Sequence, residues 1–135
     1  MIVVDTSVAV AAALPWHEAH AAALSAMPRT KTPLLAQVAI ETYSVLTRLP
    51  PPQRVPAMVA GDYLSETFVL PPLVLPSDGY RRLLDFATAG GITGGAIYDA
   101  LVGATAQEAG ATLLTLDRRA IPTYQLLQVD YRLVA

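Results

Sequence analysis

Short runs of apolar residues alternate along this chain with longer segments of helical periodicity. The runs cover residues 2–4, 32–36, 67–70, 111–116 and 126–134. Most of them are apolar at successive positions, which is typical of parallel strands buried on both faces. The pattern therefore predicts an α/β fold, a three-layer α/β/α sandwich with a mostly parallel central sheet, and a single domain over residues 1–135.

The segments between these runs are expected to be helices. They cover residues 8–14, 17–27, 37–49, 53–66, 78–89 and 94–109, and most end at a helix-stopping residue, namely Pro15, Pro50–Pro52, Gly90–Gly91 or Gly110. Thr6 or Ser7 is the expected cap of the first helix, and Ser77 that of the fifth, because a side-chain oxygen there satisfies a free backbone N–H. Residues 71–76 are expected to form an irregular connector.

The amino-acid composition limits which surfaces, metal sites and cellular locations are expected. Apolar residues make up 53% of the chain and charged residues 15%, against about 25% charged in a typical soluble protein. We therefore expect part of the surface to be covered, in a homodimer or by a partner, with the small residues of segments 8–14 and 17–27 in the interface. The absence of cysteine excludes disulfides and thiolate metal sites. The first residues, MIVVDTSVAV, lack the features of a signal peptide, which predicts a cytoplasmic protein that has no membrane segment.

Two acids follow expected strands directly. Asp5 ends the run 2–4, and Asp117 follows the run 111–116. The carboxyl ends of parallel strands meet at one edge of a sheet, where ligands bind in open α/β folds. Each acid has an alternative role as the cap of the next helix.

Two further acids lie on faces of helices that should pack. Glu41 shares a stripe with Val38 and Val45, and Asp99 shares one with Val102 and Ala106. A buried carboxylate is unfavourable unless it is paired or bound to a cation. The alternatives are a Glu–Arg pair, a stripe that is rotated to leave Glu41 at the rim, and a favourable helix dipole at Asp99.

One hypothesis accounts for all four acids, Asp5, Glu41, Asp99 and Asp117, which would converge on a divalent cation at the sheet edge. Carboxylates a few ångströms apart cannot all ionise without a compensating positive charge. A set of oxygen ligands selects Mg²⁺ or Mn²⁺ over Zn²⁺. Such a cation activates water and stabilises charge on a phosphate.

Four sequence segments in this order resemble the signature of PIN-domain nucleases. They are VDTSV at 4–8, Glu41 in a mid-chain helix, YDAL at 98–101 and LLTLDRR at 113–119. The chain also resembles the VapC toxin branch of type II toxin–antitoxin pairs in its length and in having no other module. The resemblance covers essentially the whole chain.

The resemblance implies a Mg²⁺- or Mn²⁺-dependent endoribonuclease whose metal-binding and catalytic acids are Asp5, Glu41, Asp99 and Asp117. It matches Thr6, Ser7 and Thr115 to the hydroxyls that accompany those acids. It also implies a small antitoxin partner that inserts an arginine near the acids. Many family members have a further acid or an asparagine after the last aspartate. Arg118 and Arg119 stand there in this chain, so the number of metal ions stays open.

Weaker signals have plain alternatives. The histidines of HEAH at 17–20 are three residues apart, which differs from the H-E-x-x-H of zinc proteases and favours a solvated helix face. Arg118 and Arg119 would hold RNA phosphates or form a surface pair. Tyr98 would stack on a base, although a tyrosine in the core or at its rim is the favoured interpretation.

Two other classes of function compete with the nuclease. A catalytically silent PIN-like scaffold would bind RNA or protein without cutting it. A receiver-type signalling domain also gathers acids at a sheet edge but needs a lysine nearby, and the single lysine, Lys31, is far from the acids in the sequence.

Overall fold

The computed structural model describes residues 1–134 and alternates strands with helices, as the sequence predicts. All the ladders between strands are parallel. The elements, in chain order, are β1 (Ile2–Val4), α1 (Thr6–Ala13), α2 (His20–Ala26), β2 (Thr32–Leu35), α3 (Ala36–Thr47), α4 (Ala57–Thr67), β3 (Phe68–Leu73), α5 (Ser77–Gly90), α6 (Ala96–Glu108), β4 (Thr112–Thr115), α7 (Ile121–Leu126) and β5 (Tyr131–Leu133).

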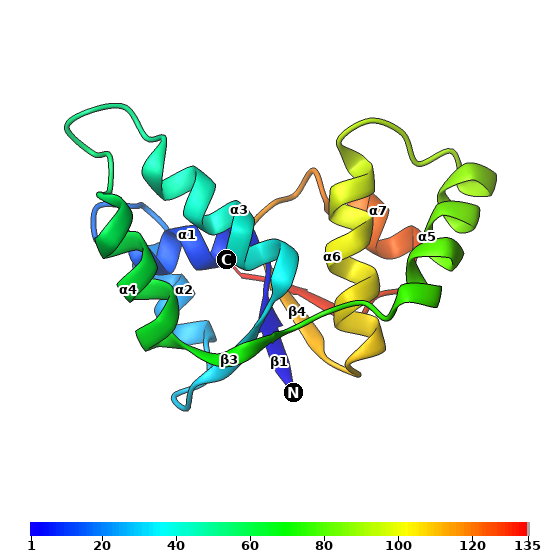
Figure 1. Ribbon diagram of the computed structural model, residues 1–135, viewed down its shortest axis with the longest axis horizontal. Coiled ribbons are helices and arrows are strands. Elements are labelled where there is room, and N and C mark those ends of the chain that lie inside the picture. The colour runs from blue at the N-terminus through cyan, green and yellow to red at the C-terminus, as the bar shows by residue number, and fades with distance from the viewer. Residues whose placement is uncertain (135) are drawn as a thin grey trace.

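The strands form the middle layer of the molecule. β1, β4 and β5 pair in that order, with Val4 opposite Leu114, and β2 pairs with β3. β2 also contacts β1, so the two ladders continue one layer. Helices α1–α4 lie on one side of the strands and α5–α7 on the other (Figure 1). This arrangement confirms the three-layer α/β/α sandwich.

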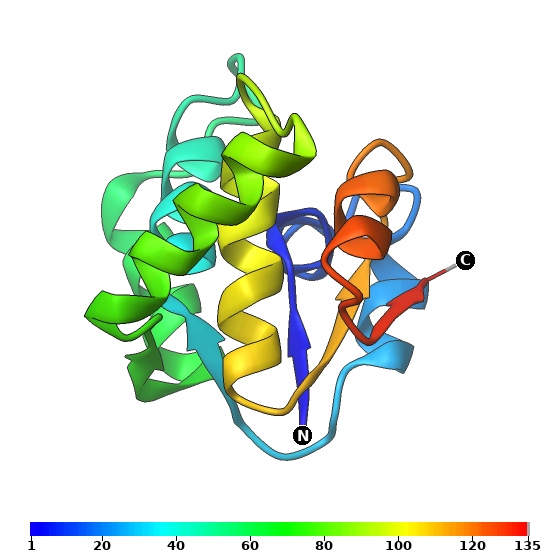
Figure 2. The same ribbon diagram turned by 90° about the vertical axis from the view of Figure 1, so that its right-hand side faces the viewer.

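The core lies where helices cover the inner strands. Val3, Val4, Leu113 and Leu114 are at most 1% exposed, which explains why these strands are apolar at successive positions. The other large, fully buried side chains come from helices and from the second ladder, and include Val8, Leu34, Leu35, Val38, Leu46, Phe68 and Tyr124. β1 and β4 point the same way (Figure 2), so their carboxyl ends meet at one edge.

Glycine ends two helices as predicted. Gly91 follows α5 with φ of 72°, and Gly110 follows α6 with φ of 66°. Both angles lie in the left-handed region that favours glycine.

Several predictions about helix starts were wrong, including that for 53–66, where α4 begins only at Ala57. The cap of α1 is Asp5, whose side chain accepts from Val8 N–H, and neither Thr6 nor Ser7 takes that role. Ser77 makes no capping hydrogen bond, because it is the first residue of α5 and Pro76 occupies the cap position. The segment 17–27 becomes helical only at His20, because a turn occupies the residues before it.

The strand predicted at 67–70 is longer than expected. β3 runs through Pro71 and Pro72 to Leu73, where a connector was predicted. β3 pairs with β2 alone, and proline is tolerated in an edge strand because one side of the strand needs no backbone donor. The short helix α7 was not predicted at all.

The predicted place of the interface is also wrong for the first helix. Val8, Ala9, Ala11 and Ala12 of α1 are at most 7% exposed, because they pack inside this chain. Leu24 of α2 is 51% exposed, and more of the exposed large apolar side chains lie on α3, α4 and α5. They include Ile40, Tyr43, Met58, Val59, Tyr80 and Leu84. No helix among residues 1–134 is both long enough and apolar enough to cross a membrane.

Candidate functional site

Asp5 is the most buried acid and lies where β1 becomes α1. It is 4% exposed, and both of its carboxylate oxygens accept hydrogen bonds. Oδ1 accepts from Ser7 Oγ and from Val8 N–H at 3.3 Å. Oδ2 accepts from Thr115 Oγ1 at 2.5 Å and from Tyr124 Oη at 3.1 Å. Burial raises the pKa of Asp5 above its usual range, and these donors oppose the rise.

The hydroxyls of Ser7 and Thr115 tie the ends of β1 and β4 together. Ser7 Oγ accepts from Leu116 N–H at 2.8 Å while it donates to Asp5. Thr115 Oγ1 accepts from Asp117 N–H at 3.0 Å and also donates to Asp5. These two residues therefore fix the carboxylate of Asp5 relative to the backbone that carries Asp117.

Glu41 lies on α3 at the edge of the buried face. The fully buried stripe of this helix is Val38, Thr42 and Leu46, so Glu41 is half-buried beside it and does not form part of it. Its oxygens accept from Thr6 Oγ1 at 2.8 Å and from Gln37 Nε2 at 2.5 Å. None of the ion pairs formed by residues 1–134 includes Glu41, which removes the Glu–Arg alternative for the described part of the chain.

Asp99 lies in the first turn of α6 and is half-buried. Burial is the main cause that raises its pKa to about 6, followed by repulsion from Asp117, Glu41 and Asp5, in that order. Arg119 opposes the rise. This repulsion shows that the four carboxylates share one neighbourhood.

Asp117 lies two residues beyond β4. Its Oδ1 accepts from the backbone N–H of Arg119 at 3.0 Å and faces Arg119 Nε at 3.4 Å. The Arg119 side chain is 93% exposed, so this pair is weak. Arg118 is exposed beside it.

The four acids line one small cavity of about 90 Å³. They come from four separate places in the sequence, and no lysine, arginine or histidine lines the cavity with them. Its lining is Asp5, Thr6, Ser7, Glu41, Asp99, Val102, Asp117 and Tyr124, which we call the acid pocket. The predicted Thr115 lies just behind it, bonded to Asp5, whereas Arg118 and Arg119 lie outside.

The acid pocket has the donors of a cation site but not the finished geometry. Among residues 1–134, no three Asp, Glu or His side chains stand in an arrangement that could hold a metal ion as they are. The oxygens of Asp5 and Glu41 instead accept hydrogen bonds from hydroxyl, amide and backbone donors. The all-carboxylate donor set fits a hard divalent cation, and side-chain rotation would have to complete its coordination.

Tyr124 is a pocket residue that the sequence did not reveal. It lies on the unpredicted helix α7, is 1% exposed and donates to Asp5 Oδ2. Burial and the nearby acids raise its pKa well above the usual tyrosine range, so the hydroxyl stays a donor. Tyr124 and Asp5 are 119 positions apart in the sequence. No spacing pattern connects residues at that separation, so no signal in the sequence points to this contact.

The structure also shows where the residues of the weaker sequence signals lie. Tyr98 is 57% exposed next to Asp99, which rules out the core. The histidines of HEAH do not form a pair, because His20 Nδ1 donates to the Ala11 carbonyl at 2.8 Å while His17 lies in the preceding turn. Lys31 directly precedes β2, at the amino end of that strand, whereas Asp5 and Asp117 follow the carboxyl ends of β1 and β4, which does not fit a receiver domain.

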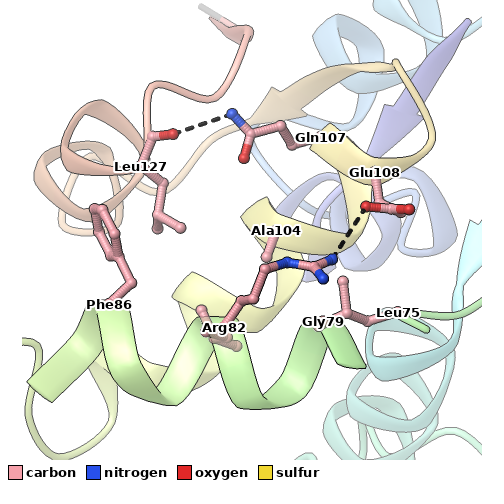
Figure 3. Close-up of a pocket in the computed structure, with 9 residues that line it drawn as sticks. Leu75, Gly79, Arg82, Phe86, Ala104, Gln107, Glu108 and Leu127 are labelled. Atoms are coloured by element: carbon pink, nitrogen blue, oxygen red, sulfur yellow. Dashed lines mark hydrogen bonds and ion pairs between the residues drawn. The ribbon is translucent and has the colours of Figure 1, made fainter. Parts of the chain in front are cut away.

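A separate cleft of about 370 Å³ lies between α5, α6 and α7 and has no cluster of acids (Figure 3). Its charged side chains, Arg82 and Glu108, face each other at 4.0 Å. Gln107 Nε2 donates to the Leu127 carbonyl at 3.1 Å. These polar groups of the cleft are thus paired within the chain. The cleft lies at the end of α6 away from Asp99.

Comparisons with known proteins agree with this architecture. The family model described as PIN domain matches residues 2–124. Ribonuclease VapC40 of Mycobacterium tuberculosis is 50% identical over 134 residues, which cover 99% of both chains. Ribonuclease VapC27 of the same species is 42% identical over 128 residues, covering 95% of this chain and 93% of the relative.

Two solved structures share the fold. The crystal structure of FitAcB from Neisseria gonorrhoeae has a TM-score of 0.67 at 19% identity, covering 97% of this chain and 96% of the other. The structure of FitAB bound to the IR36 DNA fragment has a TM-score of 0.69 at 19% identity and covers 98% and 94%. At this identity the likeness concerns the fold alone.

Proposed function

The chain belongs to the PIN-domain family, and from this premise we propose that it is a divalent-metal-dependent endoribonuclease, the toxin of a toxin–antitoxin pair. The observation that carries the proposal is the acid pocket, where four carboxylates meet without a basic lining residue. Substantial identity over nearly the whole chain to two proteins named ribonucleases supports RNA as the substrate.

Each acid would have a defined part in binding Mg²⁺ or Mn²⁺. Asp5 is held rigidly by Ser7, Thr115 and Tyr124 and would be the fixed ligand. Glu41, Asp99 and Asp117 are less buried and would turn toward it. When bound, a divalent cation would supply the charge that polarises the attacking water and stabilises the scissile phosphate.

The other polar residues orient the acids or the substrate. Thr6 and Gln37 hold the carboxylate of Glu41 through its two oxygens. Arg119 is exposed at the edge of the acid pocket, beside Asp117, and together with Arg118 it would contact RNA phosphates on either side of the cut. The expected products carry 5′-phosphate and 3′-hydroxyl ends, as the family resemblance implies.

We also propose a protein partner for this surface. A guanidinium would pair with the clustered carboxylates, so an antitoxin segment that carries an arginine would block the acid pocket. The exposed apolar side chains Ile40, Tyr43, Met58 and Val59 on α3 and α4 support a covering partner, either the antitoxin or a second copy in a homodimer.

The test of this function is cleavage of single-stranded RNA by the purified protein, free of any antitoxin. We expect cleavage with Mg²⁺ or Mn²⁺, none with a chelator, and none in Asp99→Asn although that variant stays folded. Full activity in Asp99→Asn or in chelator would contradict the mechanism. A folded protein that binds RNA but never cuts it would favour the silent scaffold.

A further inference from the structure

A groove leads out of the acid pocket along α1. Its volume is about 440 Å³, and it shares Thr6, Ser7 and Asp117 with the pocket. The two hollows therefore adjoin at these three residues. A strand of RNA whose phosphate lies at the acids would therefore place a neighbouring nucleotide in this groove.

The walls of the groove suit a neutral, flat group. Val10, Val45 and Leu116 supply apolar surface, and the acids Glu18 and Asp117 stand in the lining. Glu18 would repel a phosphate and no lysine or arginine among the lining residues would attract one, while a nucleobase carries no charge. The groove has room for a base, and apolar walls favour its burial.

His17 gives the groove a hydrogen-bond donor. The backbone N–H of Ala19 donates to His17 Nδ1 at 3.0 Å, so a neutral ring carries its proton on Nε2. Nε2 has no hydrogen-bond partner among residues 1–134. His17 lines the groove and can offer this N–H to an acceptor on the edge of a base.

Trp16 does not line the groove itself, but its aromatic ring lies next to that of His17, which does. It is the only tryptophan in the sequence and is 55% exposed, although tryptophan is among the most apolar side chains. Its ring centroid lies 6.2 Å from that of His17, with the planes inclined by 33°. Exposed aromatic rings are the usual platforms on which unpaired bases stack.

We propose that this groove is the subsite for the base next to the scissile phosphate of single-stranded RNA, with Trp16 as its stacking platform and His17 Nε2–H as its donor. The inference rests on the proposed nuclease function and extends it. It also gives the HEAH segment two separate uses. His20 fastens α2 to α1 through the Ala11 carbonyl, and His17 faces substrate.

The single tryptophan makes the proposal measurable without catalysis. In the uncut complex of Asp99→Asn with a single-stranded RNA oligonucleotide and Mg²⁺, we expect saturable quenching of tryptophan fluorescence with a shift to shorter wavelength. A stacked base covers the ring and removes it from water, which is the cause of both changes. An RNA duplex of the same sequence should quench far less, because its bases are not free to stack.

Variants then locate the contact. In the Asp99→Asn background, Trp16→Ala should weaken RNA binding about tenfold by fluorescence anisotropy, in line with the loss of one stacked base. Trp16→Phe should restore most of the affinity, and His17→Ala should weaken it severalfold. The matched control is Tyr80→Ala, which removes an aromatic side chain that is 45% exposed on α5, a helix that contributes nothing to the groove.

The outcomes separate this inference from the nuclease proposal. If the wild type cuts RNA with Mg²⁺ but fluorescence does not change and Trp16→Ala binds RNA as Tyr80→Ala does, the groove assignment is overturned and the nuclease stands. Quenching by a co-purified protein partner, but not by RNA, would likewise assign the groove to that partner. If the wild type neither binds nor cuts RNA, both proposals fail.

Discussion

At the scale of single residues, capping and cation binding are compatible roles for one acid. Asp5 caps α1, as its structural alternative required, whereas Asp117 accepts from the N–H of Arg119 and does not cap α7, whose N-cap is Ala120. Both nevertheless line the acid pocket. A carboxylate has two oxygens and about four lone-pair sites. Asp117 accepts through Oδ1 alone and keeps capacity for a ligand, whereas Asp5 already accepts from four donors, one of which would have to turn away when a cation binds.

Asp99 gives a prediction about pH and stability. Its pKa in the folded protein, about 6, is above the ordinary aspartate value of 3.8, so folding favours the protonated form. This contribution to stability is complete below the unfolded pKa and is lost as pH rises through about 6. At neutral pH and without divalent cations, Asp99→Asn should therefore unfold with a free energy about 1 kcal/mol higher than wild type, after allowance for solvent screening.

Urea unfolding at several pH values checks this difference. The gap between Asp99→Asn and wild type should widen between about pH 4 and pH 6 and then level off. Asp78→Asn is the control, because the Arg82 guanidinium lowers the pKa of this exposed acid and its removal should give no gain. A variant that is less stable than wild type at neutral pH would mean that Asp99 has a structural role.

Tyr124 gives a second prediction at this scale. Tyr124→Phe deletes a buried donor to Asp5 and should lower the free energy of unfolding by about 1–2 kcal/mol. Tyr131→Phe is the matched control, because its hydroxyl meets only the exposed Gln125 side chain in the described structure. If urea unfolding gives the same loss of free energy for both variants, the hydrogen bond from Tyr124 to Asp5 does not contribute more to stability than the exposed one.

At the scale of elements, periodic segments were predictable and short interrupted ones were not. The helix predicted over 37–49 forms as α3, and the one over 94–109 forms as α6, because each presents a continuous apolar face. α7 has six residues and a proline at its start, so it shows no periodicity to detect. Tertiary contacts stabilise it, above all the burial of Tyr124.

The approach of α7 to α6 depends on a glycine. A Cβ at Gly103 would lie 2.9 Å from Val129 Cγ2 and 3.3 Å from Tyr124 Cδ1. Gly103→Ala should therefore push α7 away and destabilise the protein by about 1 kcal/mol, even though alanine favours helices. Gly61→Ala in α4 has open space and should instead stabilise by up to about 1 kcal/mol. Thermal unfolding of the two variants measures the direction of each change in stability. A Gly103→Ala variant as stable as the wild type would show that α7 does not need the glycine at this position.

At the scale of the whole molecule, the fold brings together acids that are far apart in the sequence. Asp5 and Asp117 were predictable at one edge because β1 and β4 are parallel. Asp99 was singled out because a carboxylate on a packing face needs a reason. Glu41 was singled out for a place on the packing stripe that it does not have, since the buried stripe of α3 is Val38, Thr42 and Leu46. The directions of their side chains were not predictable. They depend on Thr6, Gln37 and Tyr124, which reach the acids only through tertiary packing.

The exposed apolar side chains of α3 and α4 lead to a prediction about assembly. Protein purified from its native host should co-elute with a small partner whose arginine occupies the acid pocket, and the complex should not cut RNA. Charge replacement of that arginine should release activity without separating the proteins, because the apolar contacts remain. A monomeric, uninhibited enzyme whose overproduction does not slow growth would contradict the toxin role but not the nuclease.

Titration of the antitoxin-free protein with Mn²⁺ measures whether the four acids form one cation site. Calorimetry should show binding to the wild type and a loss of affinity of at least about tenfold in each of Asp5→Asn, Glu41→Gln, Asp99→Asn and Asp117→Asn. Asp85→Asn removes an exposed carboxylate on α5 outside the acid pocket and should bind Mn²⁺ as the wild type does. Unchanged Mn²⁺ affinity in the four pocket variants, or an equal loss in Asp85→Asn, would show that the four acids do not form one cation site.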